Sequence, residues 1–149
     1  MSRGLGDVYK RQNLRVVSDI GSRLPIYCTS QGKVFLAHMS RTSAEALLRA
    51  QHMTQFTPHT ITDLTALMQE IDLCRANGYA IENGEYKIGL RSISAPVYTV
   101  EGKARYTVGV IGMFRSTRSD EFLAAVEQVC ATASMISTAL GYRKTEELL

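Results

Sequence analysis

The chain has 149 residues, with 17 basic and 14 acidic side chains and a formal net charge of +3 at pH 7. This length supports one domain with a buried core, and the apolar runs are shorter than the roughly 18 residues of a membrane-spanning helix. Three separated cysteines without a Cys-x-x-Cys pair, and three histidines without helical ligand spacing, indicate neither a disulfide framework nor a bound metal. A reducing cytoplasm suits this composition.

The first twelve residues, MSRGLGDVYKRQ, fit no pattern of the later sequence. They lack the apolar core of a secretory signal. The codons GAT-GTG-TAT-AAG-AGA-CAG encode DVYKRQ and resemble the transposase mosaic end used in preparing sequencing libraries. We therefore predict that residues 1–12 are a disordered sequencing-adaptor artefact and that the natural sequence begins near Asn13, inside a longer protein. This segment holds three basic residues and one acidic residue, so the remainder has a net charge of +1, too small to indicate nucleic-acid binding.

The next segments predict one strand and two short helices. Residues 13–19 (NLRVVSD) are typical of a short strand that enters a turn. Residues 33–38 (KVFLAH) form a short helix, and the hydroxyl residues before it can cap its start. Residues 42–51 (TSAEALLRAQ) form a second helix, capped by Thr42 or Ser43.

The clearest helical pattern covers residues 60–79 (TITDLTALMQEIDLCRANGY). Thr62 or Asp63 can cap its start, and Gly78 suits a left-handed end. One stripe at helical spacing predicts the face that packs on the core: Leu64, Leu67, Met68, Ile71 and Cys74.

Three strands and a long helix follow. Residues 79–82, 90–99 and 104–114 are predicted strands, and the tight connection 100–103 joins the last two as an antiparallel hairpin. Residues 119–140 predict a helix that ends before Gly141. Its apolar face comprises Phe122, Val126, Val129, Cys130, Ala133, Ile136 and Leu140. These elements predict an α/β (α+β) fold, with helices packed on an antiparallel sheet.

Three blocks of the sequence resemble one protein family. GSRLPIYCTSQGKVFLA resembles GxRLPxHxTxxGKxLLA, and FTPHTITDLTALMQEIDLCRANGYAIENGE resembles FTxxTITDxxxLxxELxxIRxxGYAxDxEE. EYKIGLRSISAPVYTVEGK resembles ExxxGLRCIAAPVxDxxGx. In this order and spacing, the blocks are similar to the effector-binding domain of IclR-type bacterial transcriptional regulators, over residues 13–142.

The resemblance implies a GAF-like domain over residues 13–149, with a central antiparallel sheet flanked by α-helices. It implies a parent protein whose N-terminal winged helix-turn-helix, not present in this sequence, binds operator DNA. The implied function is to sense a small carboxylate effector that modulates operator binding. The implied setting is a cytoplasmic homodimer or homotetramer without a cofactor, a metal or a membrane.

Ser30 and Gln31 are the first candidate effector-binding residues. The first N–H groups of a helix lack partners within the helix and can bind a carboxylate. From the residues alone, the alternative is that Thr29 or Ser30 only caps the helix. The resemblance implies that the amides of Ser30 and Gln31 bind the effector's carboxylate.

The resemblance implies three further lining residues. Glu82 would hold a hydroxyl or hydrated carbonyl group, although a solvated charge at a strand end is the alternative. Leu90 corresponds to an apolar wall. Ser92 stands where relatives often have cysteine, and its hydroxyl can donate or accept a hydrogen bond.

The last predicted strand departs from the family pattern. Strand alternation puts Thr107, Gly109 and Ile111 on one face. Relatives that bind small 2-oxo acids tend to have Ser-x-Ser where this sequence has Gly109-Val110-Ile111. We therefore expect a larger, drier pocket and a bulkier effector, an aromatic or a sugar acid, and we expect Gly109→Ser to favour smaller acids. In the alternative, Gly109 only relieves packing.

Other functions remain as alternatives to an effector domain. Cys28 with His38 or His59 would resemble a thiol nucleophile and its base, but no third group orients them, so we expect no enzymatic activity. A GAF-like sensor of another class, or a domain that only oligomerises without an effector, is the alternative function.

Overall fold

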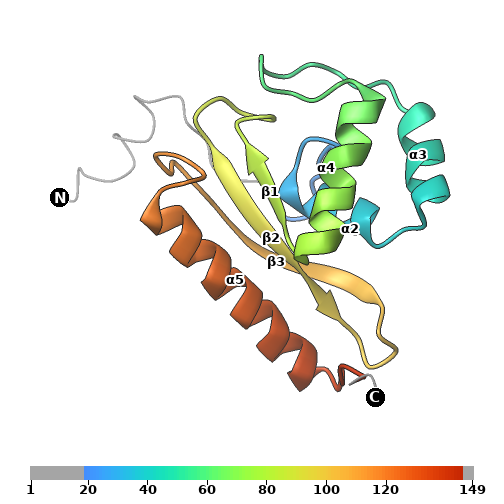
Figure 1. Ribbon diagram of the computed structural model, residues 1–149, viewed down its shortest axis with the longest axis vertical. Helices are drawn as coiled ribbons and strands as arrows, with labels where there is room; N and C mark the ends of the chain where they lie inside the picture. Colours follow the sequence, from blue (N-terminus) through green and yellow to red (C-terminus); the bar gives the residue numbers. More distant parts are fainter. Residues whose placement is uncertain (1–18, 146–149) are drawn as a thin grey trace.

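The computed structural model describes residues 19–145, which form an antiparallel sheet with helices on both of its faces (Figure 1). The strands are β1 (Ala80–Asn83), β2 (Arg91–Tyr98) and β3 (Ala104–Gly112), in the spatial order β1-β2-β3. The helices are α2 (Ser30–Ala37), α3 (Arg41–Arg49), α4 (Leu64–Asn77) and α5 (Asp120–Ala139). The predicted fold class is confirmed. The predicted artefact 1–12, and all but the last residue of the predicted strand 13–19, lie outside the described residues.

The structure tests the caps that the sequence predicted for three helices. Thr29 caps α2, because its Oγ1 accepts the Gly32 N–H at 3.2 Å. Asp63, one of the two predicted caps, caps α4, and Gly78 ends that helix with φ +77°. The predicted cap of α3 is wrong, because Ser40 accepts the Ser43 N–H and the helix begins at Arg41.

The two faces of β2 contact different helices. Its partners across the hairpin are Gly109 for Ser94, Val110 for Ile93 and Ile111 for Ser92. Side chains of paired residues share a face, so the face with Ser92 and Ser94 also carries Thr107, Gly109 and Ile111. That face meets the start of α2, where Ser30 bonds to both serines. The opposite face, with Ile93, packs on α5.

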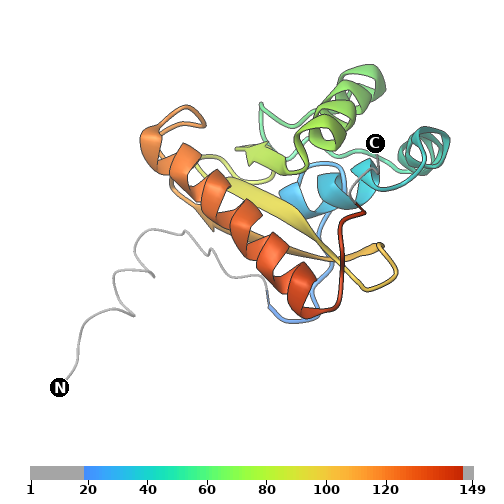
Figure 2. The ribbon, with the colours of Figure 1, turned by 60° about the horizontal axis from the view of Figure 1, so that its bottom comes forward.

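Helix α5 lies along one face of the sheet, while α2, α3 and α4 lie on the other side (Figure 2). Its buried stripe comprises Phe122, Val126, Val129, Ala133 and Ser137. The prediction that Ile136 and Leu140 belong to this face is wrong, since they are 37% and 46% exposed. Ser137 takes that place because its hydroxyl donates to the Ala133 carbonyl and accepts the Tyr98 N–H.

By length and composition, α5 is apolar enough to cross a membrane, which corrects the sequence-based exclusion of such a helix. Only 28% of the apolar stretch is buried within the fold. The buried stripe of α5 packs on β2 and β3, which is how a helix of a sheet protein covers its core.

A second core joins the three helices on the other side of the sheet. Of the predicted α4 stripe, Leu67, Met68, Ile71 and Cys74 are buried and Leu64 is partly buried. They pack on apolar side chains of α2 and α3, namely Val34, Leu36, Ala37, Ala44 and Leu48. This core fixes the position of α2, and therefore that of Ser30, against the sheet.

Candidate functional site

The start of α2 is held by the loop that precedes it. The Thr29 hydroxyl donates to the Pro25 carbonyl at 2.7 Å while accepting the Gly32 N–H. A Cβ at position 32 would overlap the backbone carbonyl of Ile26, so only glycine permits this close approach. Capping is thus performed by Thr29, and the N–H groups of Ser30 and Gln31 donate to no acceptor among residues 19–145.

Three serine hydroxyls form a buried cluster between α2 and β2. Ser30 Oγ lies 2.8 Å from Ser94 Oγ and 2.8 Å from Ser92 Oγ. The three side chains are 0–4% exposed. Ser94 was missed by the sequence analysis, although its place two residues after Ser92 on a strand puts both on one face.

Glu82 joins the serine cluster from β1. Its Oε2 accepts the Ser92 hydroxyl at 3.1 Å, and its Oε1 accepts the N–H groups of Glu85 and Tyr86 at 2.6 and 3.1 Å. Glu82 is 3% exposed, so it is not a solvated charge at a strand end. Its carboxylate instead ties the loop after β1 to the serines.

The structure brings the other predicted residues to the same side of the sheet with different exposures. Leu90 is 2% exposed, Gln31 and Thr107 are partly buried, and Ile111 is 48% exposed. Gly109 is on the expected face, but a Cβ there would overlap Ile93 O and Ser94 Oγ. Of the two interpretations of Gly109, the geometry favours the alternative, in which the glycine relieves packing, here against β2. Close approach to β2 requires a glycine, and Gly109→Ser would displace that strand.

A buried ion pair lies beside the serine cluster. Lys33 is completely buried, and its Nζ donates to Glu85 Oε1 at 2.6 Å and to the Ile81 carbonyl at 3.1 Å. Glu70 Oε2 lies 3.6 Å from the same Nζ. Burial raises the pKa of Glu85 above its usual value, and Lys33 opposes that rise. The sequence signal for this pair was a lysine directly before the apolar run VFLA, within one short helix.

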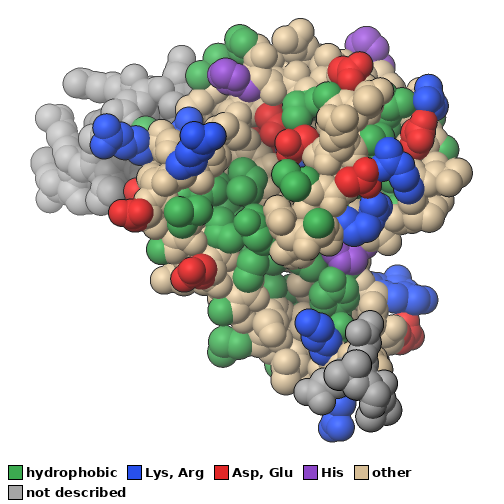
Figure 3. Space-filling view, viewed as in Figure 1, with side chains coloured by type: hydrophobic (Ala, Val, Ile, Leu, Met, Phe, Trp, Pro, Cys, Tyr) green, Lys and Arg blue, Asp and Glu red, His purple; other side chains and the backbone are tan. Residues whose placement is uncertain are grey.

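A cavity of about 390 Å³ borders this ion pair, since Glu70 and Glu85 line it. None of the eight predicted site residues lines it. Figure 3 shows acidic side chains gathered between β1 and α4, beside an apolar area. The lining residues are His59, Ile61, Glu70, Leu73, Cys74, Asn77, Tyr79, Ile81, Asn83, Glu85 and Thr117.

The cysteines and histidines do not form a nucleophile and base. Burial, with the charges of Glu85 and Glu82, raises the pKa of the Cys28 thiol to about 12, so the thiol stays protonated at neutral pH. His38 bonds instead to the Val34 carbonyl and to the Tyr98 hydroxyl, at 2.8 and 2.7 Å. Among residues 19–145, no group of three or more His, Cys, Asp or Glu side chains is placed to hold a metal ion.

Comparison with known proteins gives the same family as the sequence blocks. Residues 6–138 match the model of the C-terminal domain of the bacterial transcriptional regulator IclR. The HTH-type transcriptional repressor AllR of Escherichia coli K12 is 28% identical over 139 residues, which are 93% of this chain and 51% of AllR. The matched family and its members are transcriptional regulators and not enzymes, as predicted.

Two solved structures share the fold. The C-terminal domain of the E. coli regulator KdgR is 34% identical, with a TM-score of 0.71, over 83% of this chain and 75% of that chain. The inducer-binding domain of PobR from Acinetobacter, a double mutant in complex with 3-hydroxybenzoic acid, is 25% identical, with a TM-score of 0.71, over 89% and 75%. The chain spans about half the length of the curated relatives that it matches.

Proposed function

Because this chain belongs to the IclR family of bacterial transcriptional regulators and corresponds to their C-terminal domain, we propose that it senses a small carboxylate at the start of α2. The observation that carries the proposal is the pair of free amides. The N–H groups of Ser30 and Gln31 have no acceptor among residues 19–145, whereas Thr29 already caps the helix. Two free amides at a helix N-terminus, aided by the helix dipole, are donors suited to a carboxylate.

The serine cluster supports a polar contact for the rest of the effector. Because β3 has Gly109-Val110-Ile111 instead of Ser-x-Ser, the sequence predicted a pocket without hydroxyls on this face. Ser92 and Ser94 of β2 place two hydroxyls there. Ser30, Ser92 and Ser94 are satisfied by one another and by Glu82, so an entering ligand must replace some of these hydrogen bonds. A hydroxylated acid can do so, because its hydroxyl and carboxylate supply both donors and acceptors.

We propose an aromatic or a sugar acid as the effector class. The PobR domain, which has the same fold, is seen with 3-hydroxybenzoic acid. That molecule combines a carboxylate with one ring hydroxyl, which matches the free amides and the serine hydroxyls of this chain. Leu90 and the exposed Ile111 supply apolar contacts for its ring.

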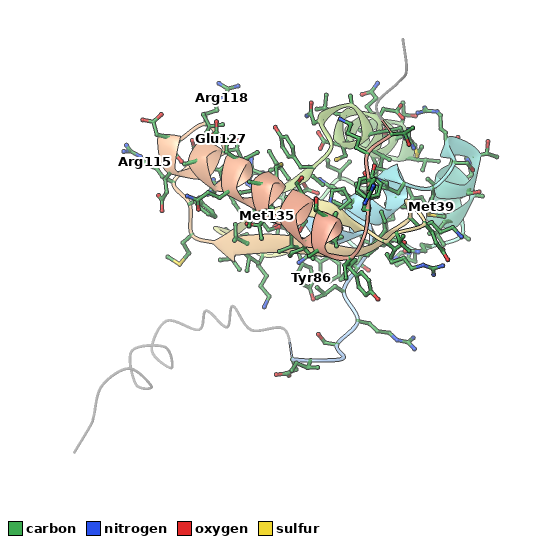
Figure 4. All side chains as sticks on the ribbon, turned by 90° about the horizontal axis from the view of Figure 1, so that it is seen from below. Met39, Tyr86, Arg115, Arg118, Glu127 and Met135 are labelled. Carbon is green, nitrogen blue, oxygen red and sulfur yellow. The ribbon has the colours of Figure 1, made fainter. Side chains whose placement is uncertain are left out.

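The proposed regulation links effector binding to DNA binding by the parent protein. An effector shifts the balance between DNA-competent and DNA-incompetent arrangements only if it binds them with different affinity. We propose that the domain acts in a cytoplasmic homodimer or homotetramer, with operator DNA bound by an N-terminal domain of the parent. Exposed apolar side chains on β3 and α5, including Val110 at 41% and Met135 at 73%, support contact with another chain. Met135 is labelled on α5 in Figure 4.

Calorimetric titration with 3-hydroxybenzoate, gluconate and pyruvate tests the carboxylate site. The decisive variant is Ser30→Pro. Proline is favoured at the first position of a helix, and Thr29 already has the extended backbone that a residue before proline needs (φ −123°, ψ 146°). The substitution therefore removes one amide donor and keeps α2. We expect it to weaken binding of the preferred acid by about tenfold or more, the value of a hydrogen bond to a charged group.

Ser30→Ala is the matched control, because it removes the same hydroxyl and keeps the amide. It is expected to bind the acid more tightly than Ser30→Pro. Equal affinity in the two variants and the parent chain would contradict the carboxylate assignment. If no acid binds while a stable oligomer forms, the alternative of a domain that only oligomerises is favoured.

A further inference from the structure

The structure points to a second ligand site, and we propose that the cavity between α4 and β1 binds a small organic primary amine. It is the cavity of about 390 Å³ described above, and it is called the α4–β1 cavity below. This volume is in the range of small-molecule sites, which begins at about 300 Å³. The cavity is separate from the proposed carboxylate site, since none of that site's residues lines it.

The Glu85 side chain lines this cavity and carries an unsatisfied carboxylate oxygen. Glu85 is 5% exposed, its Oε1 accepts a hydrogen bond from Lys33, and its buried Oε2 has no hydrogen-bond partner among residues 19–145. A buried acceptor without a donor is costly, and a charged one more so. A ligand that brings a donor to Oε2 removes this cost.

Lys33 does not supply that donor. Its Nζ donates to Glu85 Oε1 at 2.6 Å and to the Ile81 carbonyl at 3.1 Å, and it forms an ion pair with Glu70 Oε2 at 3.6 Å, beyond hydrogen-bond distance. One buried cation is therefore shared by two carboxylates, which leaves the end of the cavity near Glu70 and Glu85 negative. A second ammonium group, brought by a ligand, would balance that charge.

The other lining residues indicate what kind of body, apart from the ammonium group, the ligand has. Its apolar side chains include Ile61, Leu73 and Ile81, and Leu73 is 56% exposed at the surface. Asn77 and Asn83 add neutral amides. An amine with a short aliphatic or aromatic body fits this lining, because it pairs its ammonium with the carboxylates and covers the apolar side chains. An anion would be repelled by the same carboxylates.

Three probes that share one body and differ in the head group test the proposal on the full chain. They are 2-phenylethylammonium, 2-phenylethanol and 3-phenylpropionate, each titrated by calorimetry at pH 7. We expect the amine to bind at least about tenfold more tightly than the alcohol, as for a charge-assisted hydrogen bond. Ser30→Pro is expected to bind the amine like the parent chain, which separates this site from the proposed carboxylate site.

Variants locate the binding. Glu85→Gln keeps an acceptor for Lys33 and is expected to weaken amine binding by about tenfold or more. Glu70→Gln changes a side chain that is 40% exposed and is expected to weaken binding less. Leu73→Trp adds bulk at the exposed part of the cavity and leaves Lys33 and Glu85 unchanged, so it tests the site even if Glu85→Gln fails to fold. Glu121→Gln, on the first turn of α5, is the control and is expected to change nothing.

Equal affinity for the amine and the alcohol would overturn the proposal. So would amine binding that survives Glu70→Gln and Leu73→Trp unchanged, because the amine would then be bound elsewhere.

Discussion

Replacing Lys33 with methionine is expected to lower the free energy of unfolding by about 3–5 kcal/mol at pH 7, the usual cost of breaking a buried ion pair from one side. Methionine fills a similar volume but leaves the Glu85 carboxylate without its buried cation. The loss is large compared with the total stability of a domain, about 5–15 kcal/mol. Urea denaturation followed by circular dichroism measures it. A Lys33→Met variant within about 1 kcal/mol of the parent would contradict the role of the pair.

Two further variants separate the pair from its surroundings. Glu70→Gln removes the second carboxylate near Lys33 and is expected to cost no more than about 1 kcal/mol, because Glu70 is 40% exposed and its Oε2 lies 3.6 Å from Lys33 Nζ, beyond hydrogen-bond distance. The double variant Lys33→Met with Glu85→Leu is expected to be more stable than Lys33→Met alone, because no unpaired charge is then buried.

The pH dependence of the Lys33→Met defect follows from the raised pKa of Glu85. A carboxyl group whose pKa is higher in the folded state adds stability below its unfolded pKa, and this contribution is lost as the pH rises through the folded pKa. Burial raises the pKa of Glu85, and Lys33 is the main group that opposes the rise. Without Lys33, the destabilisation is therefore expected to be smaller at pH 5 than at pH 7.

Gly109→Ala is expected to lower the free energy of unfolding by about 1–3 kcal/mol, the cost of overpacking. The added Cβ would overlap the Ile93 carbonyl and the Ser94 hydroxyl, so β2 and β3 must separate locally. Gly112→Ala on the same strand is the matched control. Its Cβ would meet only the Phe114 ring, at 3.4 Å, which is an ordinary contact.

The control variant is expected to change stability by no more than about 0.5 kcal/mol. Thermal and urea denaturation of both variants give the comparison. Equal stability of Gly109→Ala and Gly112→Ala would show that the close approach at Gly109 does not constrain the hairpin.

The parts of the fold that depend on local sequence were predictable. The apolar stripe of α4 and the glycine that ends it lie within one helix, so residues close in sequence determine both. The hairpin of β2 and β3 is likewise joined by a short turn. The predicted cap of α3 was wrong because Ser40, Thr42 and Ser43 are all favourable cap residues, and their propensities do not rank one above the others. The buried face of α5 was predicted wrongly near its C-terminal end. There, the hydrogen-bonded Ser137 is buried, whereas Ile136 and Leu140 are exposed.

The candidate site was predictable where residue patterns and the family resemblance coincide. Ser30, Ser92 and Glu82 come together in the structure, from three separate elements. Ser94 and the Lys33–Glu85 pair were missed, because long-range contacts between α2, β2 and the loop after β1 create them. Gly109 was interpreted either as space for a ligand or as relief of packing. The close approach of β3 to β2, which only glycine permits there, accounts for it.

Carboxylate binding at the start of α2 is tested most directly by titrating the ¹⁵N-labelled chain with 3-hydroxybenzoate, observed by NMR at each backbone amide. We expect saturable shifts that are largest at the amides of Ser30 and Gln31, because their N–H groups donate to the carboxylate. Saturable shifts that leave these two amides unchanged, or the absence of any saturable shift with 3-hydroxybenzoate, gluconate or pyruvate, would contradict it.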